Sequence, residues 1–231
     1  MRIIDEALAE GRKILSEHES KRVLSQFGIP VTPEALVNNP DDAKKAAQKI
    51  GFPVVLKGAS PTLTHKTELG MVELGIKDDF DLEGAYRRIV SSHKAKCEQV
   101  LVQKMIHGER ELIVGFTRDF QFGPCVMFGL GGIFAELFRD VTFRLPPLTE
   151  QDAMEMMGDI QGRKILGDFR GRSPVNKETL ARILIIVGNI GTQYEVIHEI
   201  DINPLIVRQD GTVIAVDALI GLSPSASREK G

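Results

Sequence analysis

Hydrophobic residues recur at helical spacing near the start of the chain and again in its second half, and this pattern predicts amphipathic helices. The first helical stretch ends at Gly28 and Pro30, which together form a stop signal. Asn39 followed by Pro40 is a start signal for a helix that ends at Gly51. Helices are therefore expected within 3–28, 40–50 and 82–95, and in two segments that begin after Thr149 and Asn176.

Short apolar runs between these helices predict strands, and the arrangement changes near residue 105. Up to that point strands and helices alternate, which indicates an α/β lobe. From Glu111 onward long strands are joined by tight turns, which indicates antiparallel sheet. The strands expected are 31–37, 53–57, 72–76, 100–105, 111–119, 125–129, 141–145, 196–207 and 213–219.

This change of pattern divides the chain into two lobes, with the boundary just after residue 104. The smaller lobe is expected to span 31–104, and the larger lobe to combine 1–30 with 105–222. Residues 223–231 are expected to form a disordered tail. The fold class is therefore α/β (α+β), in two lobes.

The most informative stretch for metal binding is the predicted hairpin EIDINPLIVRQDGTVIAVDA, residues 199–218. A three-residue loop that ends at a left-handed Gly211 would place Asn203 directly opposite Asp217, with Asp201 joining them two residues along. Such carboxylate and amide oxygens suit Mg²⁺. A two-residue Asp210-Gly211 turn would instead put Asn203 and Asp217 on opposite faces, and a solvated hairpin edge is the third interpretation.

A second stretch, GFPVVLKGASPTLTHKTELGMV at 51–72, brings a cation and a histidine close together in sequence. The apolar run 53–56 predicts a buried strand with Lys57 at its end, where a lysine can bind phosphate oxygens. His65 follows in a loop, where a neutral imidazole can act as a nucleophile toward a phosphoryl group. The alternative is a surface histidine without a chemical role.

Two further features are compatible with nucleotide binding. The backbone of 100–105, which includes Gln103, Lys104 and Met105, can pair with an adenine edge, and Glu111 can accept hydrogen bonds from ribose hydroxyls. The glycine cluster at 129–132 allows either a close approach to phosphate or a tight turn between strands. It is not a Walker A loop, because no Gly-Lys-Ser/Thr follows it.

Composition and charge narrow the class of partner. The 231 residues carry a net charge of -3 and no long basic run, so nucleic acid is not an expected partner. Cys97 and Cys125 fit neither a metal spacing nor a disulfide framework, which favours a reducing compartment. No leader and no apolar run of membrane-spanning length is present, so the protein is expected in the cytoplasm, without a membrane partner.

Several of these motifs, taken in order, resemble the small β subunit of ADP-forming acetyl-CoA synthetases (acyl-CoA:ADP ligases), which belong to the ATP-grasp family. The resemblance covers nearly the whole chain. It is carried by PVVLK at 53–57, SPTLTHK at 60–66, the stretch from ERELIVG to LPPLT at 109–149, FRGRSPVN at 169–176, and DINPLIV with VDA within 201–218.

The resemblance implies an ATP-grasp fold with nucleotide bound between the two lobes, and it implies roles for residues already singled out. His65 matches the phosphorylated histidine and Lys57 the phosphate-binding lysine. The adenine hinge matches Gln103, Lys104 and Met105, and the nucleotide-contacting glutamate matches Glu111. The Mg²⁺ ligands match Asn203 and Asp217, and Asp201 is a further candidate ligand.

The activity implied is that of an acid-thiol ligase, in which acyl-CoA, ADP and phosphate give carboxylate, ATP and CoA. An α subunit that binds CoA is the implied partner, in a hetero-oligomer of two α and two β subunits (α2β2), with Mg²⁺ and ADP or ATP as cofactors. Two alternatives stay open. One is an ATP-grasp carboxylate ligase without a phosphohistidine, and the other is a nucleotide-binding regulatory module.

Overall fold

The computed structural model describes residues 1–59, 70–92, 97, 99–108, 110–132, 140–168 and 171–223. By its internal contacts the chain divides into two units, one formed by Met1–Val31 with His107–Gly231 and the other by Thr32–Ile106. The sequence pattern placed these divisions one or two residues earlier, at 30/31 and 104/105. Each unit has its own sheet and its own hydrophobic core.

The smaller unit is a four-stranded antiparallel sheet in the order β1-β4-β2-β3, with two helices. Buried side chains of α3 and α4 form its core with one face of the sheet, which includes Val54 and Leu56. The elements are β1 (Glu34–Val37), α3 (Pro40–Ile50), β2 (Val54–Ala59), β3 (Val72–Ile76), α4 (Asp79–Val90) and β4 (Gln99–Lys104).

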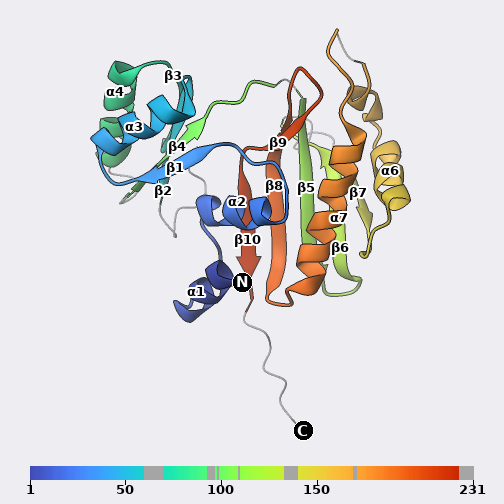
Figure 1. Ribbon diagram of the computed structural model, residues 1–231. Helices are drawn as coiled ribbons and strands as arrows, with labels where there is room; N and C mark the ends of the chain where they lie inside the picture. Colours follow the sequence, from blue (N-terminus) through green and yellow to red (C-terminus); the bar gives the residue numbers. More distant parts are fainter. Residues whose placement is uncertain are drawn as a thin grey trace. The chain divides into compact units, whose positions relative to one another are not determined.

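The larger unit is built on a six-stranded antiparallel sheet in the order β10-β8-β5-β6-β7, with β9 paired to β8. In Figure 1 helix α7 lies in front of this sheet and runs along its strands, and α2 lies crosswise in front of β8 and β10. The elements are α1 (Arg2–Ala9), α2 (Glu17–Gln26), β5 (Arg110–Asp119), β6 (Gly123–Leu130), β7 (Val141–Arg144), α6 (Glu150–Asp159), a 3-10 turn (Arg163–Leu166), α7 (Lys177–Gln193), β8 (Ile197–Val207), β9 (Val213–Ala215) and β10 (Ala218–Leu222).

The helix starts expected from the sequence are confirmed by their capping hydrogen bonds. The side chain of Asn39 accepts from the backbone N–H of Asp42, and Asn176 caps α7 in the same way. Thr149 and Asp152 form a reciprocal capping box at the start of α6. These caps satisfy N–H groups that the first helical turn leaves without a partner, so the short-range sequence signal is sufficient to fix them.

The largest differences from the expected bounds occur in three elements. The strand expected at 31–37 begins only at Glu34, and the helix expected at 82–95 begins at Asp79, capped by Asp78. The strand expected at 213–219 is divided into β9 and β10 by Val216 and Asp217.

The core of the larger unit lies between one face of its sheet and the helices. Phe116 of β5 packs so closely on α7 that a Cβ added at Gly191 would lie 2.4 Å from its ring, so only glycine fits at this position. Ile200 and Ile202 of β8 are buried in the same core. Because side chains alternate along a strand, Asp201 between them lies on the opposite face of the sheet.

The structure also shows the state of the two cysteines and the character of the helices, for which expectations were drawn from the sequence. Cys97 and Cys125 are both free thiols, Cys125 buried and Cys97 half-buried. Within the described ranges, none of the helices combines the length and the apolar character needed to cross a membrane.

Candidate functional site

The β8–β9 hairpin has the three-residue loop that the sequence predicted. Arg208 pairs with Thr212 through an N–H···O=C bond of 2.8 Å, and Gly211 adopts a left-handed φ of 82°. The backbone N–H of Gly211 also donates to the carbonyl of Arg208 at 3.0 Å. The interpretation with a two-residue turn is therefore wrong, and the register of the hairpin follows from the longer loop.

This register puts Asn203 directly opposite Asp217, at the interruption between β9 and β10. The N–H of Asn203 donates to the carbonyl of Asp217 at 3.2 Å, and the N–H of Val216 donates to Pro204 at 3.0 Å. Ile202 next to Asn203 and Ala218 next to Asp217 are both buried in the core. The side chains of Asn203 and Asp217 therefore leave the sheet together on its other face, where Asn203 is exposed and Asp217 half-buried.

Asp201 extends this polar group along β8. It pairs with Gly115 of β5 on one side and with Leu219 of β10 on the other, so its carboxyl group lies over the middle of the sheet. Burial raises its pKa to about 6, and the negative charges of Glu199 and Asp217 contribute in the same direction. The carboxylate of Asp217 is thus close enough to disfavour ionisation of Asp201.

The oxygen donors of these residues fit a hard divalent cation whose other coordination positions are filled by waters or by a bound phosphate. Asp201, Asn203 and Asp217 offer two carboxylates and one amide oxygen on one face of the sheet. Across the described segments, no cluster of three or more His, Cys, Asp or Glu side chains is arranged to hold a metal ion. Mg²⁺ matches this sparse set, because it keeps several waters and is bound by one or two carboxylates together with substrate phosphates.

Glu111 lies on the same face of the larger sheet, near the start of β5. It pairs with Ile206 of β8, three residues along from Asn203, and its neighbour Leu112 is buried in the core. The glycine cluster packs against it, because Gly131 donates to the carbonyl of Glu111 at 2.7 Å. A Cβ at Gly132 would lie 2.9 Å from a carboxylate oxygen of Glu111. The glycines therefore leave room for this carboxylate, and the segment that follows them lies outside the described residues.

Lys57 belongs to the smaller unit and lies within β2, not at its end as the sequence suggested. The strand continues to Ala59, and Lys57 pairs with Val72 of β3 and Leu101 of β4. Its neighbour Leu56 is in the core under α3 and α4, so Lys57 lies on the sheet face away from these helices. The side chain is only 7% exposed. His65 lies outside the described residues.

The residues expected to form the adenine hinge lie at the end of β4, between β1 and β2 in the sheet of the smaller unit. They make many contacts within that unit. The Gln103 amide donates to the hydroxyl of Thr32 at 2.6 Å, and the Lys104 ammonium donates to the carbonyls of Gly51 and Phe52 at 2.8 and 3.0 Å. The backbone N–H of Met105 donates to Pro53 at 3.1 Å. These side chains therefore stabilise the smaller unit itself, a role that the sequence pattern did not indicate.

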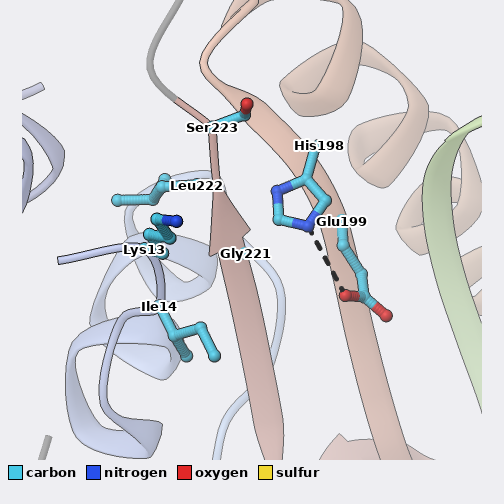
Figure 2. Close-up of a pocket in the computed structure, with 7 residues that line it drawn as sticks. All are labelled: Lys13, Ile14, His198, Glu199, Gly221, Leu222 and Ser223. Carbon is cyan, nitrogen blue, oxygen red and sulfur yellow. Dashed lines mark ion pairs between the residues drawn. The ribbon is translucent and has the colours of Figure 1, made fainter.

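A separate hollow of about 430 Å³ lies beside β10 (Figure 2). A β-bulge at this end of the β8–β10 pair turns His198 over Gly221, and a Cβ at Gly221 would lie 2.5 Å from the imidazole. Nε2 of His198 is 3.9 Å from a carboxylate oxygen of Glu199, and Lys13 lines the same hollow. No pattern in the sequence indicated this group, because the bulge that creates it is a tertiary feature.

Comparison with known proteins places these observations in a family context. A model of the ATP-grasp domain matches residues 6–222. The β subunit of acetate–CoA ligase [ADP-forming] I from Pyrococcus furiosus is 43% identical over 221 residues, which cover 94% of each chain. Acetate–CoA ligase [ADP-forming] I from Archaeoglobus fulgidus is 39% identical over 92% of this chain, but this match covers only 31% of that longer protein.

Solved structures show the same likeness. A dinucleotide-forming acetyl-coenzyme A synthetase from Ca. Korarchaeum cryptofilum, in complex with coenzyme A and Ca-AMPCP, superposes with a TM-score of 0.92 at 44% identity, covering 96% of this chain and 99% of that one. A second structure of that protein holds Mg-AMPPCP, with a phosphohistidine segment pointing towards the nucleotide site (TM-score 0.85, 43% identity, 96% and 99% covered).

Proposed function

The chain belongs to the ATP-grasp family, and on this premise we propose that it is the nucleotide-binding β subunit of an ADP-forming acyl-CoA ligase. The observation that carries the proposal is the 43% identity to the Pyrococcus furiosus β subunit over 94% of both chains. The reaction is the conversion of acyl-CoA, ADP and phosphate to carboxylate, ATP and CoA. In this reaction the present chain supplies the site where the phosphoryl group meets ADP.

The metal ligands of this site are Asn203 and Asp217, with Asp201 beside them. Mg²⁺ would neutralise negative charge on the phosphate oxygens of the nucleotide. The interruption between β9 and β10 holds the two main ligands in register, because Asn203 and Asp217 share a backbone hydrogen bond. Their side chains therefore need no rearrangement to face the same ligand, which reduces the entropic cost of binding.

His65 is the proposed phosphoryl carrier. Its neutral imidazole attacks phosphorus of the incoming phosphoryl group, so that a new P–N bond forms as the bond from phosphorus to the donor group of the partner subunit breaks. In the second half of the relay the P–N bond breaks, and a terminal phosphate oxygen of ADP forms the new P–O bond that makes ATP. Lys57 contributes a fixed positive charge for the transferring oxygens, so catalysis rests mainly on positioning and electrostatics.

The nucleotide itself is assigned to three further positions. The strand end at Gln103, Lys104 and Met105 would contact adenine through backbone carbonyl groups, because its polar side chains and the N–H groups of Lys104 and Met105 are engaged inside the smaller unit. Glu111 would accept hydrogen bonds from the ribose hydroxyls. The room that Gly131 and Gly132 leave around its carboxylate supports this role.

A CoA-binding α subunit is the proposed partner, in a complex of two copies of each chain. Two observations support a partner: the Pyrococcus relative is named as a β subunit, and the Archaeoglobus relative is a longer chain of which this one matches 31%. The larger unit also exposes apolar side chains that another chain could cover. Phe122, Phe143 and Leu145 are 69%, 50% and 59% exposed around a hollow of about 520 Å³.

The experiment that tests this function follows the phosphoryl group. The purified chain is incubated with Mg²⁺ and γ-labelled ATP, alone and with the α subunit, and the protein is analysed for acid-labile, base-stable label. His65→Ala should abolish the label. His107→Ala serves as the control, because His107 is an exposed histidine with no assigned role, and this variant should keep it.

Each outcome assigns a different mechanism. Label that is lost only in His65→Ala supports the phosphohistidine relay. Ligase activity that survives in His65→Ala would favour a carboxylate ligase without a phosphohistidine. Nucleotide binding without label or ligase activity, even with the α subunit present, would favour a regulatory module and overturn the proposal.

A further inference from the structure

A buried lysine of α2 is bonded to the peptide that carries Asp217. The side chain of Lys21 is 1% exposed and that of its ion-pair partner Glu17 is 4% exposed, with 3.0 Å between Nζ and the carboxylate oxygen. Nζ also donates to the carbonyl of Val216 at 3.1 Å. Val216 immediately precedes Asp217, so an ammonium group from helix α2 holds the peptide unit that leads into a proposed metal ligand.

The carbonyl of Val216 lies where the ordinary sheet pattern stops. β9 ends at Ala215 and β10 begins at Ala218, so Val216 and Asp217 form the interruption between the two strands. A partly buried backbone carbonyl at such an interruption is stabilised by a donor, because a polar group that is withdrawn from water without a partner is costly. Lys21 supplies such a donor from helix α2.

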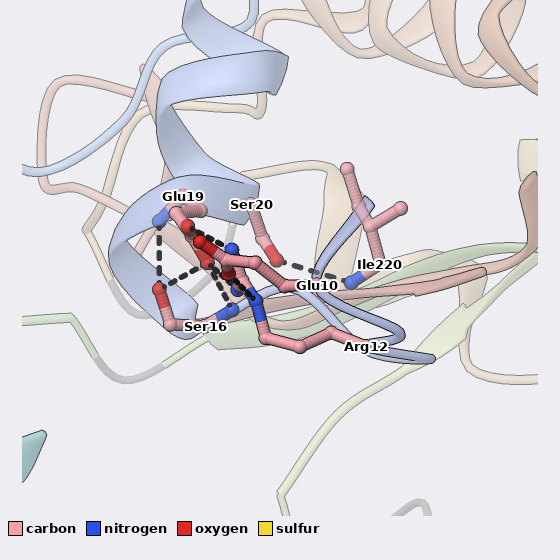
Figure 3. A network of polar contacts seen from close by, with 6 residues as sticks. All are labelled: Glu10, Arg12, Ser16, Glu19, Ser20 and Ile220. Atoms are coloured by element: carbon pink, nitrogen blue, oxygen red, sulfur yellow. Dashed lines mark hydrogen bonds and ion pairs between the residues drawn. The ribbon is translucent and has the colours of Figure 1, made fainter. Parts of the chain in front are cut away.

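Helix α2 is itself fixed against β10, so the position of Lys21 is well defined. The neighbouring residue Ser20 accepts a hydrogen bond from the backbone N–H of Ile220 at 3.1 Å (Figure 3). At the start of the helix, Ser16 and Glu19 form a capping box. Arg12 binds both carboxylate oxygens of Glu19 at 2.7 and 3.0 Å. These contacts anchor the first turns of α2 at both the strand and the preceding segment.

We propose that Lys21, together with Glu17, is a positioning residue for the metal site, and that it sets the orientation of the Asp217 carboxylate through the Val216–Asp217 peptide. This inference rests on the proposed function of Asp217 as a Mg²⁺ ligand. A buried ion pair adds little to stability compared with apolar residues of the same volume. A positioning role gives a physical reason for burying two charges at this point of the fold. Residues that orient metal ligands typically change metal affinity about 10- to 100-fold when they are replaced.

The test measures the Mg²⁺ dependence of ADP binding to the full-length chain by calorimetry. Lys21→Met should raise the Mg²⁺ concentration needed for half-maximal enhancement of ADP affinity by about tenfold, by analogy with other groups that orient metal ligands. ADP affinity in the presence of a chelator should stay unchanged. Lys21→Arg keeps the charge and the donors and should restore most of the Mg²⁺ response. Lys44→Met is the matched control, because Lys44 pairs with Glu83 at the surface of the smaller unit.

Other outcomes show whether the positioning role or the proposed function is wrong. If Lys21→Met lowers ADP affinity equally with Mg²⁺ and with chelator, or changes neither, the positioning role is overturned while the metal site stands. Should Lys21→Met fail to fold, Lys21→Arg and Glu17→Gln decide between the same outcomes by the same measurement. If the wild-type chain shows no effect of Mg²⁺ on ADP binding, the proposed function fails, and this inference fails with it.

Discussion

Asn203 and Asp217 lie directly opposite each other, joined by a backbone hydrogen bond of 3.2 Å from the N–H of Asn203 to the carbonyl of Asp217. Pro204 follows Asn203 in β8, and a proline has no N–H with which to continue the ladder. The strand pair is therefore irregular at the point where it presents two oxygen donors on one face. Irregular backbone at this proposed metal site agrees with the tendency of such features to occur beside active sites.

Replacing Asp217 by Asn should weaken the Mg²⁺-dependent part of ADP binding about 10- to 100-fold, because an anionic ligand becomes a neutral one of the same shape. Binding in the presence of a chelator should change little. Calorimetric titration with ADP under both conditions measures the two effects separately. Glu195→Gln removes an exposed carboxylate of the same unit and serves as control. An equal Mg²⁺ response in Asp217→Asn and wild type would remove Asp217 from the metal site.

In the metal-free protein the pKa of Asp201 should be near 6, and Asp217→Asn should lower it, because one neighbouring negative charge is removed. Carboxyl ¹³C chemical shifts followed against pH measure this directly. A pKa raised above its unfolded value near 3.9 means that Asp201 contributes most to stability below about pH 4, and that this contribution is lost as pH rises through about 6. Asp201→Asn should therefore stabilise the metal-free chain at pH 8 but not at pH 4. A pKa near 4 would contradict the burial of this group.

The Arg12–Glu19 pair predicts a different dependence on pH. Burial alone would raise the pKa of Glu19, but hydrogen bonds from Arg12 and Ser16 lower it overall. Its contribution to stability is therefore present above the unfolded pKa of about 4.3 and is lost as pH falls through the lowered folded value. Glu19→Gln should reduce the free energy of unfolding by about 1–3 kcal/mol at pH 7. Denaturant titrations should show this difference shrinking below pH 4. A constant difference at all pH values would exclude the ion pair as its cause.

Gly211→Ala tests the loop that sets the hairpin register. Its left-handed φ of 82° costs an L-residue about 1 kcal/mol, and a Cβ would lie 2.1 Å from the carbonyl oxygen of Pro174. Gly123→Ala is the matched control, because Gly123 has a φ of 76° with no atom within 4 Å of the added Cβ. We expect a loss of about 1 kcal/mol for Gly123→Ala and at least twice that for Gly211→Ala, measured by chemical denaturation. Equal losses would mean that the segment at Pro174 moves freely.

Short-range signals in the sequence were sufficient for the helix starts and for the hairpin. Asn39 and Thr149 cap their helices as predicted, because a cap involves only residues within one turn of each other. The three-residue loop likewise places Asn203 opposite Asp217, because loop length and the conformation of Gly211 set the hairpin register locally. The fold class and the pair of oxygen donors therefore follow from local patterns in the amino-acid sequence.

The tertiary structure decided what depends on contacts between distant segments. It divided the expected strand 213–219 at Val216, whose carbonyl accepts a hydrogen bond from Lys21 of α2, 195 residues away in sequence. It also placed Lys57 inside a strand, because pairing with β3 and β4 extends beyond the apolar run. The raised pKa of Asp201 depends on burial between two neighbouring strands. By itself the sequence determined the local geometry and the chemical groups of this protein. Burial and long-range hydrogen bonds arise only on folding, and they decided how those groups are positioned and which of them are charged.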